Sequence, residues 1–393
     1  MLNILNRSSL IFENDIKNNE RKLTEIINSS NFLIIGGAGS IGQAVVKEIF
    51  KRNPNLIHVV DISENNLVEL VRDLRSSLGY ISGEFKTFAI DVNSIEFDML
   101  TSKNTRYDYV LNLAALKHVR SGEDAITLMR LVQVNVLNVI KTISIAKQIN
   151  AKKYFAVSTD KATDPVNLMG ASKKIMELFL NRNDNNITTS TARFANVGFS
   201  DGSLLYGFKQ RLSKEQPLAV PKNIFRYFIT DTEAGKLCLL SCILGTNRDL
   251  FIPTVSKKLK PSELSSIAER FLHQNGFKAY YCSSEAEARQ SIEALKAKSK
   301  WPIFLSEPNT SGEKEIEKFY TEGETVDFSR FEEIGVIRND EQAEIEKLDH
   351  FVDDIEKLKA AEDWKKEDFV NIFKKLLPNF TIMRSNHTLN NRM

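Results

Sequence analysis

The sequence predicts an α/β protein built on a doubly wound parallel sheet, with a smaller, mostly helical C-terminal lobe. Apolar runs of strand length alternate with amphipathic stretches of helix length from about residue 31 to 200. These runs are apolar throughout, as expected for strands that helices cover on both faces. From about residue 259 the chain is charged and helical in pattern, so the alternation ends and a second lobe is expected.

Each expected element has its own signal. Residues 1–30 are polar and partly helical, and they lead to the first strand. Strands are expected at apolar runs, at 31–37, 56–61, 86–92, 107–115, 152–159, 187–196 and 249–255. Helices are expected where apolar residues recur at helical spacing, at 41–53, 65–78, 125–150, 170–182, 207–215 and 232–244. Short extended pieces are expected at 217–220 and 226–230.

The composition excludes several classes of protein. Of the 393 residues, 42% are hydrophobic and 26% are charged, which is typical of a globular chain. Three cysteines are too few for a disulfide framework, and no histidine pattern near Cys238 and Cys242 indicates a metal site. No apolar window has the length of a membrane span, and the N-terminus lacks the apolar core of a signal peptide. We therefore expect a soluble cytoplasmic protein without a metal.

The charge is unevenly distributed along the chain. The formal net charge is only +2, which argues against a nucleic-acid partner. Residues 307–368, however, carry 21 acidic and 9 basic side chains, so the rest of the chain carries a surplus of +14. A basic body suits an anionic substrate. The acidic stretch is interpreted as solvated helix faces.

A glycine-rich turn connects the first strand to the first helix of the sheet. Gly36, Gly39 and Gly42 allow a tight turn, and the backbone of Ser40 and Ile41 can approach a pyrophosphate at the helix N-terminus. Asp61 ends the second strand, 19 residues after the last glycine, where a carboxylate accepts both hydroxyls of an adenosine ribose. A Rossmann-type site is predicted, with NAD favoured over NADP. The alternative is that Asp61 only caps the next helix.

The neighbouring strands also end in functional groups. Asp91 and Val92 end the third strand, where the adenine would lie. The fifth strand ends in Thr159, Asp160 and Lys161, which bring a hydroxyl, a carboxylate and an amine to the edge where a doubly wound sheet binds ligands. Such a set can polarise an alcohol and supply a general acid and a general base. The alternative is an ordinary loop with a solvated Asp–Lys pair.

Three segments carry a resemblance to a known family. NLAALKHV (112–119), STDKATDPVNLMGASK (158–173) and ARFANVGFSDGS (192–203) resemble the extended short-chain dehydrogenase/reductases. More narrowly, they resemble the CapD-like UDP-N-acetylglucosamine 4,6-dehydratases of polysaccharide and glycoprotein-glycan biosynthesis. The resemblance covers about residues 30–260 and extends weakly to Gly312-Glu313-Lys314. Residues 265–310 fit it poorly and are expected to be an insertion or a divergent lobe.

The resemblance implies a reaction and a set of roles. Oxidation at C4 of the sugar is followed by loss of water across C5–C6 and return of the hydride to C6, with NAD kept bound. Thr159 would orient the C4 oxygen, Asp160 would protonate the departing C6 hydroxyl, and Lys161 would remove the C5 proton. The remaining residues that the resemblance implies at the cofactor are Ala114, Ala115, Asn135 and Lys173. Asn135 has an equally good alternative as a helix residue that satisfies buried backbone.

The implied substrate site contains one departure from the wider superfamily. Most short-chain dehydrogenases have Tyr four residues before the helix Lys, and here that residue is Met169. Met169 cannot take the C4 hydroxyl proton, so that step shifts to Asp160 or to water held by Thr159. The other residues implied at the UDP-sugar are Lys117, Asn196, Ser203, Val220 (in 218–220, beside the uracil) and Arg226. A surface position is the alternative for Arg226.

These inferences give a domain layout and two rival functions. We expect a helical leader (1–30), an NAD-binding Rossmann domain (31–200, joined again by 229–258) and a substrate-binding lobe (201–228 and 259–393). Helices 125–150 and 170–182 resemble the pair that forms dimers in the family, so a homodimer or higher homo-oligomer is expected. The rivals are a UDP-sugar 4-epimerase and a catalytically silent dinucleotide-binding scaffold.

Overall fold

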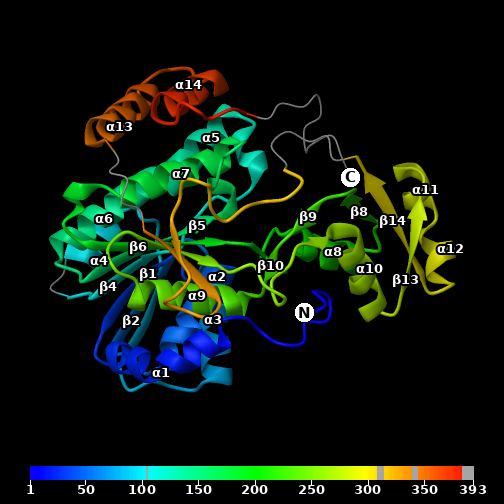
Figure 1. Cartoon of the computed structure of the whole chain (residues 1–393), viewed down its shortest axis with the longest axis horizontal. Helices are drawn as coiled ribbons and strands as arrows, with labels where there is room; N and C mark the ends of the chain where they lie inside the picture. Colours follow the sequence, from blue (N-terminus) through cyan, green and yellow to red (C-terminus); the bar gives the residue numbers. More distant parts are fainter. Residues whose placement is uncertain (103–104, 308–313, 339–343, 383–393) are drawn as a thin grey trace.

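The computed structural model describes residues 1–102, 105–307, 314–338 and 344–382. Within these ranges, nine strands form a central sheet in the order β15-β16-β11-β6-β5-β4-β1-β2-β3 (Figure 1). Seven strands, from β3 to β11, run parallel, whereas β16 is antiparallel to β11 and β15 to β16. The predicted doubly wound parallel sheet is confirmed. Its strands are β1 (Asn31–Ile35), β2 (Leu56–Asp61), β3 (Glu84–Ala89), β4 (Tyr109–Asn112), β5 (Lys153–Thr159), β6 (Thr188–Phe194), β11 (Asp249–Pro253), β15 (Val326–Asp327) and β16 (Ile334–Arg338).

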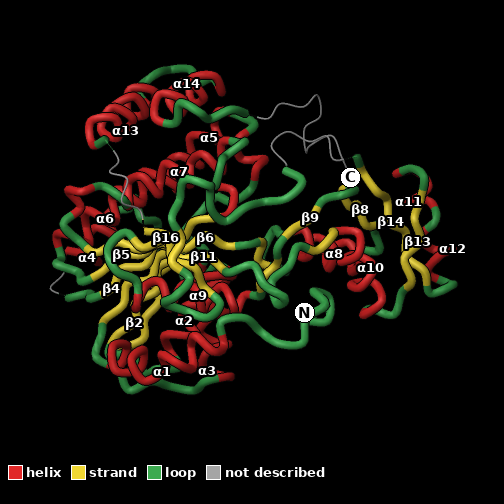
Figure 2. The backbone as a smooth tube through the Cα atoms, in the orientation of Figure 1, coloured by secondary structure: helices red, strands yellow, loops and turns green. Residues whose placement is uncertain are grey.

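Helices cover both faces of this sheet because successive strand residues point to opposite sides. In β1, Phe32 and Ile34 pack into one core, and Leu33 and Ile35 pack into the other. The first core is covered by α1 (Glu13–Asn28), α2 (Ser40–Phe50), α3 (Glu64–Ser77) and α9 (Asp231–Leu244). The second is covered by α4 (Ile95–Ser102), α6 (Asn138–Gln148) and α7 (Leu168–Leu180) (Figure 2).

One helix corrects the expectation that no apolar window reaches spanning length. Residues Ala125–Gln148 form a continuous helix of 24 residues, made of α5 (Ala125–Val132), a π-helical turn η2 (Gln133–Leu137) and α6. By length and composition it is the one candidate for a membrane span in the part of the chain that is described, with mean hydropathy 1.3. Its window is 67% buried inside the protein, so the helix belongs to the core.

A smaller lobe extends from the carboxyl end of the sheet (Figure 1). It holds a parallel sheet in the order β13-β14-β8, which the expected mostly helical lobe did not include. Residues 265–310 supply two of these strands, and β14 pairs with β8, so that segment continues the lobe that residues 201–228 begin. The elements of the lobe are α8 (Leu204–Ser213), β8 (Leu218–Pro221), α10 (Leu264–Gln274), β13 (Lys278–Cys282), α11 (Glu285–Gln290), α12 (Ile292–Lys296) and β14 (Lys300–Ser306).

Short pieces connect the two lobes. β7 and β10 pair in parallel over two residues, and β9 and β12 pair antiparallel over two residues. These short strands are β7 (Asn196–Val197), β9 (Phe225–Arg226), β10 (Phe228–Ile229) and β12 (Ser262–Glu263). The large lobe also contains the 3-10 turns η1 (Val119–Gly122), η3 (Asp160–Ala162) and η4 (Asn183–Asn185).

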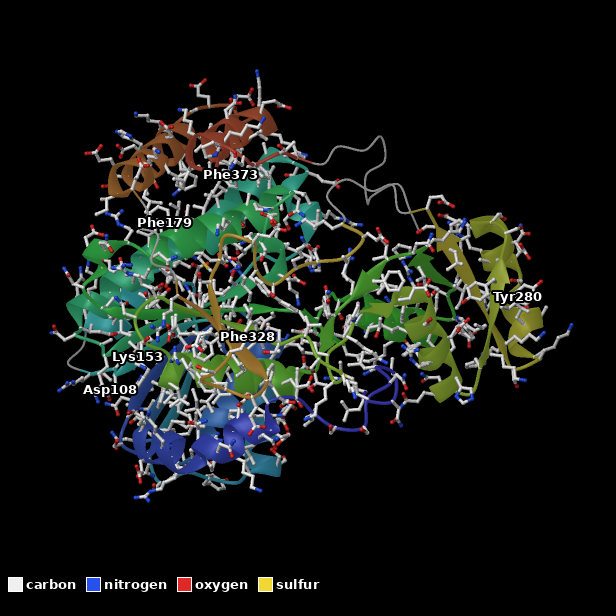
Figure 3. All side chains as sticks on the ribbon, viewed as in Figure 1. Asp108, Lys153, Phe179, Tyr280, Phe328 and Phe373 are labelled. Carbon is white, nitrogen blue, oxygen red and sulfur yellow. The ribbon has the colours of Figure 1, made fainter. Side chains whose placement is uncertain are left out.

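The C-terminal helices lie apart from the smaller lobe. α13 (Ile345–Lys359) and α14 (Lys366–Leu376) pack on α5 and α7, although residues 259–393 were expected to form one substrate lobe (Figure 3). The Phe351 ring lies 6.2 Å from Phe179 of α7 and 5.9 Å from Phe373 of α14. The chain itself thus covers the face of α5 and α7 that was expected to form a dimer. A dimer through that face remains a prediction, and the packing of α13 and α14 argues against it.

Candidate active site

A cavity of about 1600 Å³ lies between the carboxyl edge of the sheet and the smaller lobe. Most of the residues predicted from the sequence line it, although they come from segments far apart in the chain. They are Gly36, Gly39, Ser40, Ile41, Gly42, Asp61, Asp91, Val92, Ala114, Ala115, Lys117, Thr159, Asp160, Lys161, Met169, Lys173, Asn196, Ser203 and Arg226. Asn135 and Val220 are not part of the lining.

The glycine-rich turn is closely packed under one end of this cavity. Gly36 has φ +72°, and a Cβ there would lie 2.5 Å from the amide nitrogen of Ala114. A Cβ on Gly42 would lie 2.2 Å from the carbonyl oxygen of Gly36. Side chains are therefore excluded, and the N-terminus of α2, which begins after Gly39, opens to the cavity. Such a turn can hold an anionic phosphate.

Asp61 holds this turn to the second strand. One carboxylate oxygen accepts from the backbone N–H of Ala38 at 3.0 Å, and the other accepts from that of Ser63 at 3.0 Å. The cap of α3 is Ser63, whose hydroxyl accepts from the Asn66 N–H. Asp61 is therefore not the side chain that caps the helix, and it lines the cavity as a dinucleotide site requires.

The predicted catalytic residues lie at the end of β5. The Thr159 hydroxyl donates to Asp160 Oδ1 at 2.9 Å, and the Lys161 ammonium donates to the same oxygen at 3.0 Å. Asp160 is 1% exposed, and its second oxygen, Oδ2, accepts no hydrogen bond from the described residues. Helix α7 packs directly against this turn, because a Cβ on Gly170 would lie 2.3 Å from the Lys161 carbonyl oxygen. Asp160 is thus buried and the Lys161 side chain is 21% exposed, so the pair is largely shielded from solvent, whereas the alternative required a solvated one.

Glu317, which was not among the residues predicted from the sequence, lies beside this pair. Glu317 is 4% exposed, lines the cavity, and its Oε1 lies 3.9 Å from Lys161 Nζ. Burial raises the pKa of Glu317, Asp160 adds to that rise, and Lys161, Arg226 and Lys314 oppose it. The one signal in the sequence was its place three residues after Lys314. Gly312 and Glu313 of that motif lie outside the described residues.

Two residues of α7 form the floor of the cavity. Lys173 is 4% exposed and donates to the Val157 carbonyl oxygen at 3.1 Å. Burial lowers the pKa of Lys173 to about 8, although Glu177 opposes the shift. Met169, one turn earlier on the same helix, also lines the cavity. A thioether stands where the superfamily tyrosine would place a hydroxyl.

Cationic side chains come to the cavity from other elements. The Lys117 ammonium donates to Ser200 Oγ at 3.4 Å, and burial lowers the pKa of Lys117, opposed by Asp201 and Asp231. Arg226 is buried, and its guanidinium donates to the Phe225 and Glu315 carbonyl oxygens at 2.8 and 3.0 Å. The alternative of a surface arginine is therefore wrong. Arg211 of α8, which was not predicted from the sequence, also lines the cavity.

Two more predicted residues line the cavity and also form hydrogen bonds with backbone groups. The Asn196 amide donates to the Tyr227 carbonyl oxygen at 3.3 Å, and the Ser203 hydroxyl caps α8 by accepting from the Tyr206 N–H at 3.2 Å. Asn196 and the N-terminus of α8, which Ser203 caps, both lie at the cavity.

Two predicted ligand residues do not reach the cavity. The Asn135 amide exchanges two 2.9 Å hydrogen bonds with the backbone of Leu116 and donates to Ser172 Oγ at 3.0 Å. It braces the loop that carries Lys117, so its effect on a cofactor is indirect. Val220 packs into the core of the smaller lobe, while its strand neighbours Ala219 and Pro221 face the cavity. The prediction placed the correct strand at the cavity but chose a residue on its other face, because successive side chains of a strand point to opposite sides.

Comparison with known proteins identifies relatives over the sheet and the site. The chain is 31% identical over 262 residues to an uncharacterized membrane protein of Methanocaldococcus jannaschii, covering 65% of this chain and 76% of the relative. It is 30% identical over 244 residues to the capsular polysaccharide biosynthesis protein CapD of Staphylococcus aureus, covering 61% of this chain but 40% of that protein. It is 29% identical over 258 residues to a UDP-N-acetylglucosamine 4,6-dehydratase (inverting) of Campylobacter jejuni, covering 63% and 74%.

Solved structures share the fold. Pen from Bacillus thuringiensis superposes with a TM-score of 0.65 at 22% identity, over 80% of this chain and 89% of that one. WbmF from Bordetella bronchiseptica, solved with NAD⁺, superposes with a TM-score of 0.51 at 18% identity, over 64% and 80%. A family profile described as polysaccharide biosynthesis protein matches residues 32–339, which include the glycine turn, the Thr159–Lys161 segment and Glu317. The chain therefore belongs to the polysaccharide biosynthesis protein family.

Proposed function

We propose that this chain is an NAD-dependent dehydratase that converts UDP-N-acetylglucosamine to a UDP-4-keto-6-deoxy-N-acetylhexosamine. The observation that carries the proposal is the Asp160–Lys161 pair, with Asp160 buried, in the same cavity as the glycine turn. A carboxylic acid and an amine side by side suit an elimination next to a ketone, which requires an acid and a base at adjacent carbons. A relative with the same named activity, 29% identical, supports the choice.

The residues present fit a dinucleotide. The crowded positions of Gly36 and Gly42 leave backbone N–H groups, rather than side chains, to face a pyrophosphate. Asp61 keeps unused acceptor capacity for ribose hydroxyls and would repel a 2′-phosphate, so NAD is proposed over NADP. Lys173, which lines the cavity, would hold the nicotinamide ribose. The neighbour WbmF was solved with NAD⁺.

The proton transfers are assigned to the chain's own residues. Bound NAD would supply the hydride acceptor at C4 and the hydride donor at C6. Asp160 takes the C4 hydroxyl proton and gives it to the departing C6 hydroxyl, so one proton passes from O4 to O6 and leaves in water. Lys161, as a free amine, removes the C5 proton, and after that proton has exchanged with solvent the Lys161 ammonium protonates C5 again. Thr159 orients Asp160 through their 2.9 Å hydrogen bond.

Cationic and polar residues around the smaller lobe would hold the UDP part. Lys117 and Arg226 supply positive charge for the diphosphate, and Asn196 and Ser203 supply an amide and a helix N-terminus. The uracil would lie against Ala219 and Pro221 of β8. Met169 provides no proton acceptor at O4, which supports dehydration over epimerisation by a tyrosine.

The experiment is NMR of the purified protein with UDP-N-acetylglucosamine in D₂O and no added cofactor. A 6-methyl signal with deuterium at C5 is expected, and the coupling constants give the C5 configuration. A 4-epimer without loss of water would identify an epimerase, and an unchanged sugar with the dinucleotide bound would identify a scaffold. Either outcome refutes the proposed dehydratase.

Two variants test the assigned roles. Asp160→Asn and Lys161→Ala should each abolish turnover and leave NAD bound, because neither side chain supports the glycine turn. Asp353→Asn is the matched control, since that carboxylate is exposed on α13, away from the cavity. Turnover near that of the wild type in either site variant would contradict the role assigned to that residue.

A further inference from the structure

The cavity holds a second buried carboxyl at the reacting end. Glu317 Oε1 lies 3.9 Å from Lys161 Nζ, which is within ion-pair distance. Its other oxygen, Oε2, is buried and accepts no hydrogen bond from the described residues, and the nearest ammonium, that of Lys314, is 3.8 Å away. A buried carboxylate with so few donors has a strong tendency to take a proton.

The position of Glu317 is fixed by the segment around it. Lys314 donates to the Thr163 carbonyl oxygen at 2.9 Å, just beyond the catalytic turn. Arg193 of β6 donates to the Phe319 carbonyl oxygen and to both oxygens of Glu324. Residues 314–324 are thus attached on both sides of Glu317, which keeps its carboxyl beside Lys161.

The proposed reaction requires a group that accepts the ammonium proton of Lys161. Lys161 must be a free amine to remove the C5 proton, so its ammonium proton has to go to another group. Asp160 is nearer, at 3.0 Å, but a protonated Asp160 could not take the C4 hydroxyl proton in the first step. Glu317 is the other carboxyl that faces the ammonium.

We propose that Glu317 exchanges a proton with Lys161 and so sets the fraction of Lys161 that is a free amine. In this step an N–H bond of the ammonium breaks and an O–H bond forms on Glu317, with no other reactant. The charged groups that face Glu317 are Lys161, Asp160, Arg226 and Lys314. The raised pKa of Glu317, caused by burial, favours the exchange. The inference rests on the proposed function, and it makes Glu317 a positioning residue that acts through Lys161.

The test is the pH dependence of turnover in Glu317→Gln. If Lys161 and Glu317 share one proton, the pair holds the same number of protons as the pH changes, so the amine fraction and kcat of the wild type should stay level with pH. In Glu317→Gln, the amine forms only by losing a proton to solvent, so kcat should fall about tenfold for each pH unit lowered. Glu317→Asp keeps a carboxyl and should restore the level profile at a lower rate. Glu322→Gln is the matched control, because Glu322 is an exposed glutamate of the same segment.

A second measurement does not depend on turnover. Acetic anhydride reacts with amines but not with ammonium groups, and mass spectrometry locates the product on Lys161. Labelling of Lys161 should be nearly level with pH in the wild type and in Glu322→Gln, and steep in Glu317→Gln. Retained NAD and an unchanged melting curve show that the variant is folded.

The outcomes separate the two proposals. Turnover in the wild type, with kcat and labelling profiles of the same shape in Glu317→Gln, refutes the proton exchange and leaves the function standing. No keto product in the wild type, with labelling profiles that differ as expected, refutes the function and leaves the exchange standing. A loss of kcat by one constant factor at every pH identifies a merely structural role and overturns the inference.

Discussion

Arg193 offers the strongest test of how the 314–324 segment is held. Its guanidinium is fully buried and donates five hydrogen bonds of 2.7–2.9 Å. Two go to Glu177 of α7, two go to Glu324, and one goes to the Phe319 carbonyl oxygen. Arg193→Met keeps an apolar stem of similar length and removes the charge. Glu177 and Glu324 then remain with Lys174, 3.8 Å from each.

The expected loss of stability is large. Removing one partner of a buried ion pair costs about 3–5 kcal/mol, because the remaining charge stays buried without compensation. Here two carboxylates lose their partner, and Ser158, which donates to Glu177 at 2.5 Å, compensates only in part. We expect Arg193→Met to lower the free energy of unfolding by about 4 kcal/mol at pH 8.

The loss should depend on pH with a definite sign. Burial alone would raise the pKa of Glu177 and of Glu324, but Arg193 holds both below the usual value. In the wild type this contribution is present above the unfolded pKa of about 4.3 and is lost as the pH falls below it. Without Arg193, burial raises both pKa values, so the variant loses stability as the pH rises. The difference between the two proteins should therefore be smaller near pH 4.5, where the variant has not yet lost stability through its raised pKa values, and largest near pH 8.

Urea denaturation at both pH values measures this difference, and hydrogen exchange shows whether residues 314–324 open first. Arg21→Met is the matched control, because that arginine is 92% exposed and pairs with Glu25 on the surface of α1. An exposed pair contributes about 0–1 kcal/mol. A loss below about 1 kcal/mol in Arg193→Met at pH 8, or the same loss at both pH values, would refute the reasoning.

Three further predictions concern single residues. Lys173→Met should weaken NAD binding, and in the wild type the affinity, measured by titration calorimetry, should fall above about pH 8 as the Lys173 ammonium loses its proton. Gly170→Ala should abolish turnover but retain NAD, because the new Cβ displaces the Lys161 carbonyl oxygen; the NMR assay with bound-cofactor analysis checks it. Phe373→Ala should lower the free energy of unfolding by about 3–5 kcal/mol, whereas Phe328→Ala, at a side chain 48% exposed (Figure 3), should change it little.

Much of the large lobe is predictable from the sequence because its signals are local. The parallel strands are apolar runs followed by turns, and the glycine turn shows its constraint in three positions. The antiparallel β16 gives no such signal. It is a run of five residues in a charged stretch, and it becomes a strand only by pairing with β11, more than 80 residues earlier. The packing of α13 and α14 on α5 and α7 is likewise a matter of long-range contact, which helical spacing alone does not specify.

The site shows the same division. The segment Thr159–Lys161 could be identified because its three functional groups are adjacent and follow a strand. The sequence does not show which side of a strand faces the cavity. Val220 was therefore predicted at the ligand, although its neighbours Ala219 and Pro221 line the cavity. Asn135 was placed at the cofactor, although its amide is fully used by the backbone of Leu116 and by Ser172.

The structure changes the interpretation of the charge distribution, because it brings the acidic stretch 307–368 into contact with the basic remainder of the chain. Residues 307–368 were interpreted as a solvated acidic surface, yet Glu317 is buried beside Lys161, and Glu324, 12% exposed, pairs with Arg193; Lys161 and Arg193 belong to the basic body. A carboxylate enters a protein core when an opposite charge offsets part of the cost of its desolvation. The acidic stretch thus compensates the basic surplus at the site itself, and it supplies the carboxyl that we propose as the proton acceptor of Lys161. Neutralising Glu317 should therefore alter the pH dependence of the reaction, which a purely solvated acidic surface could not do.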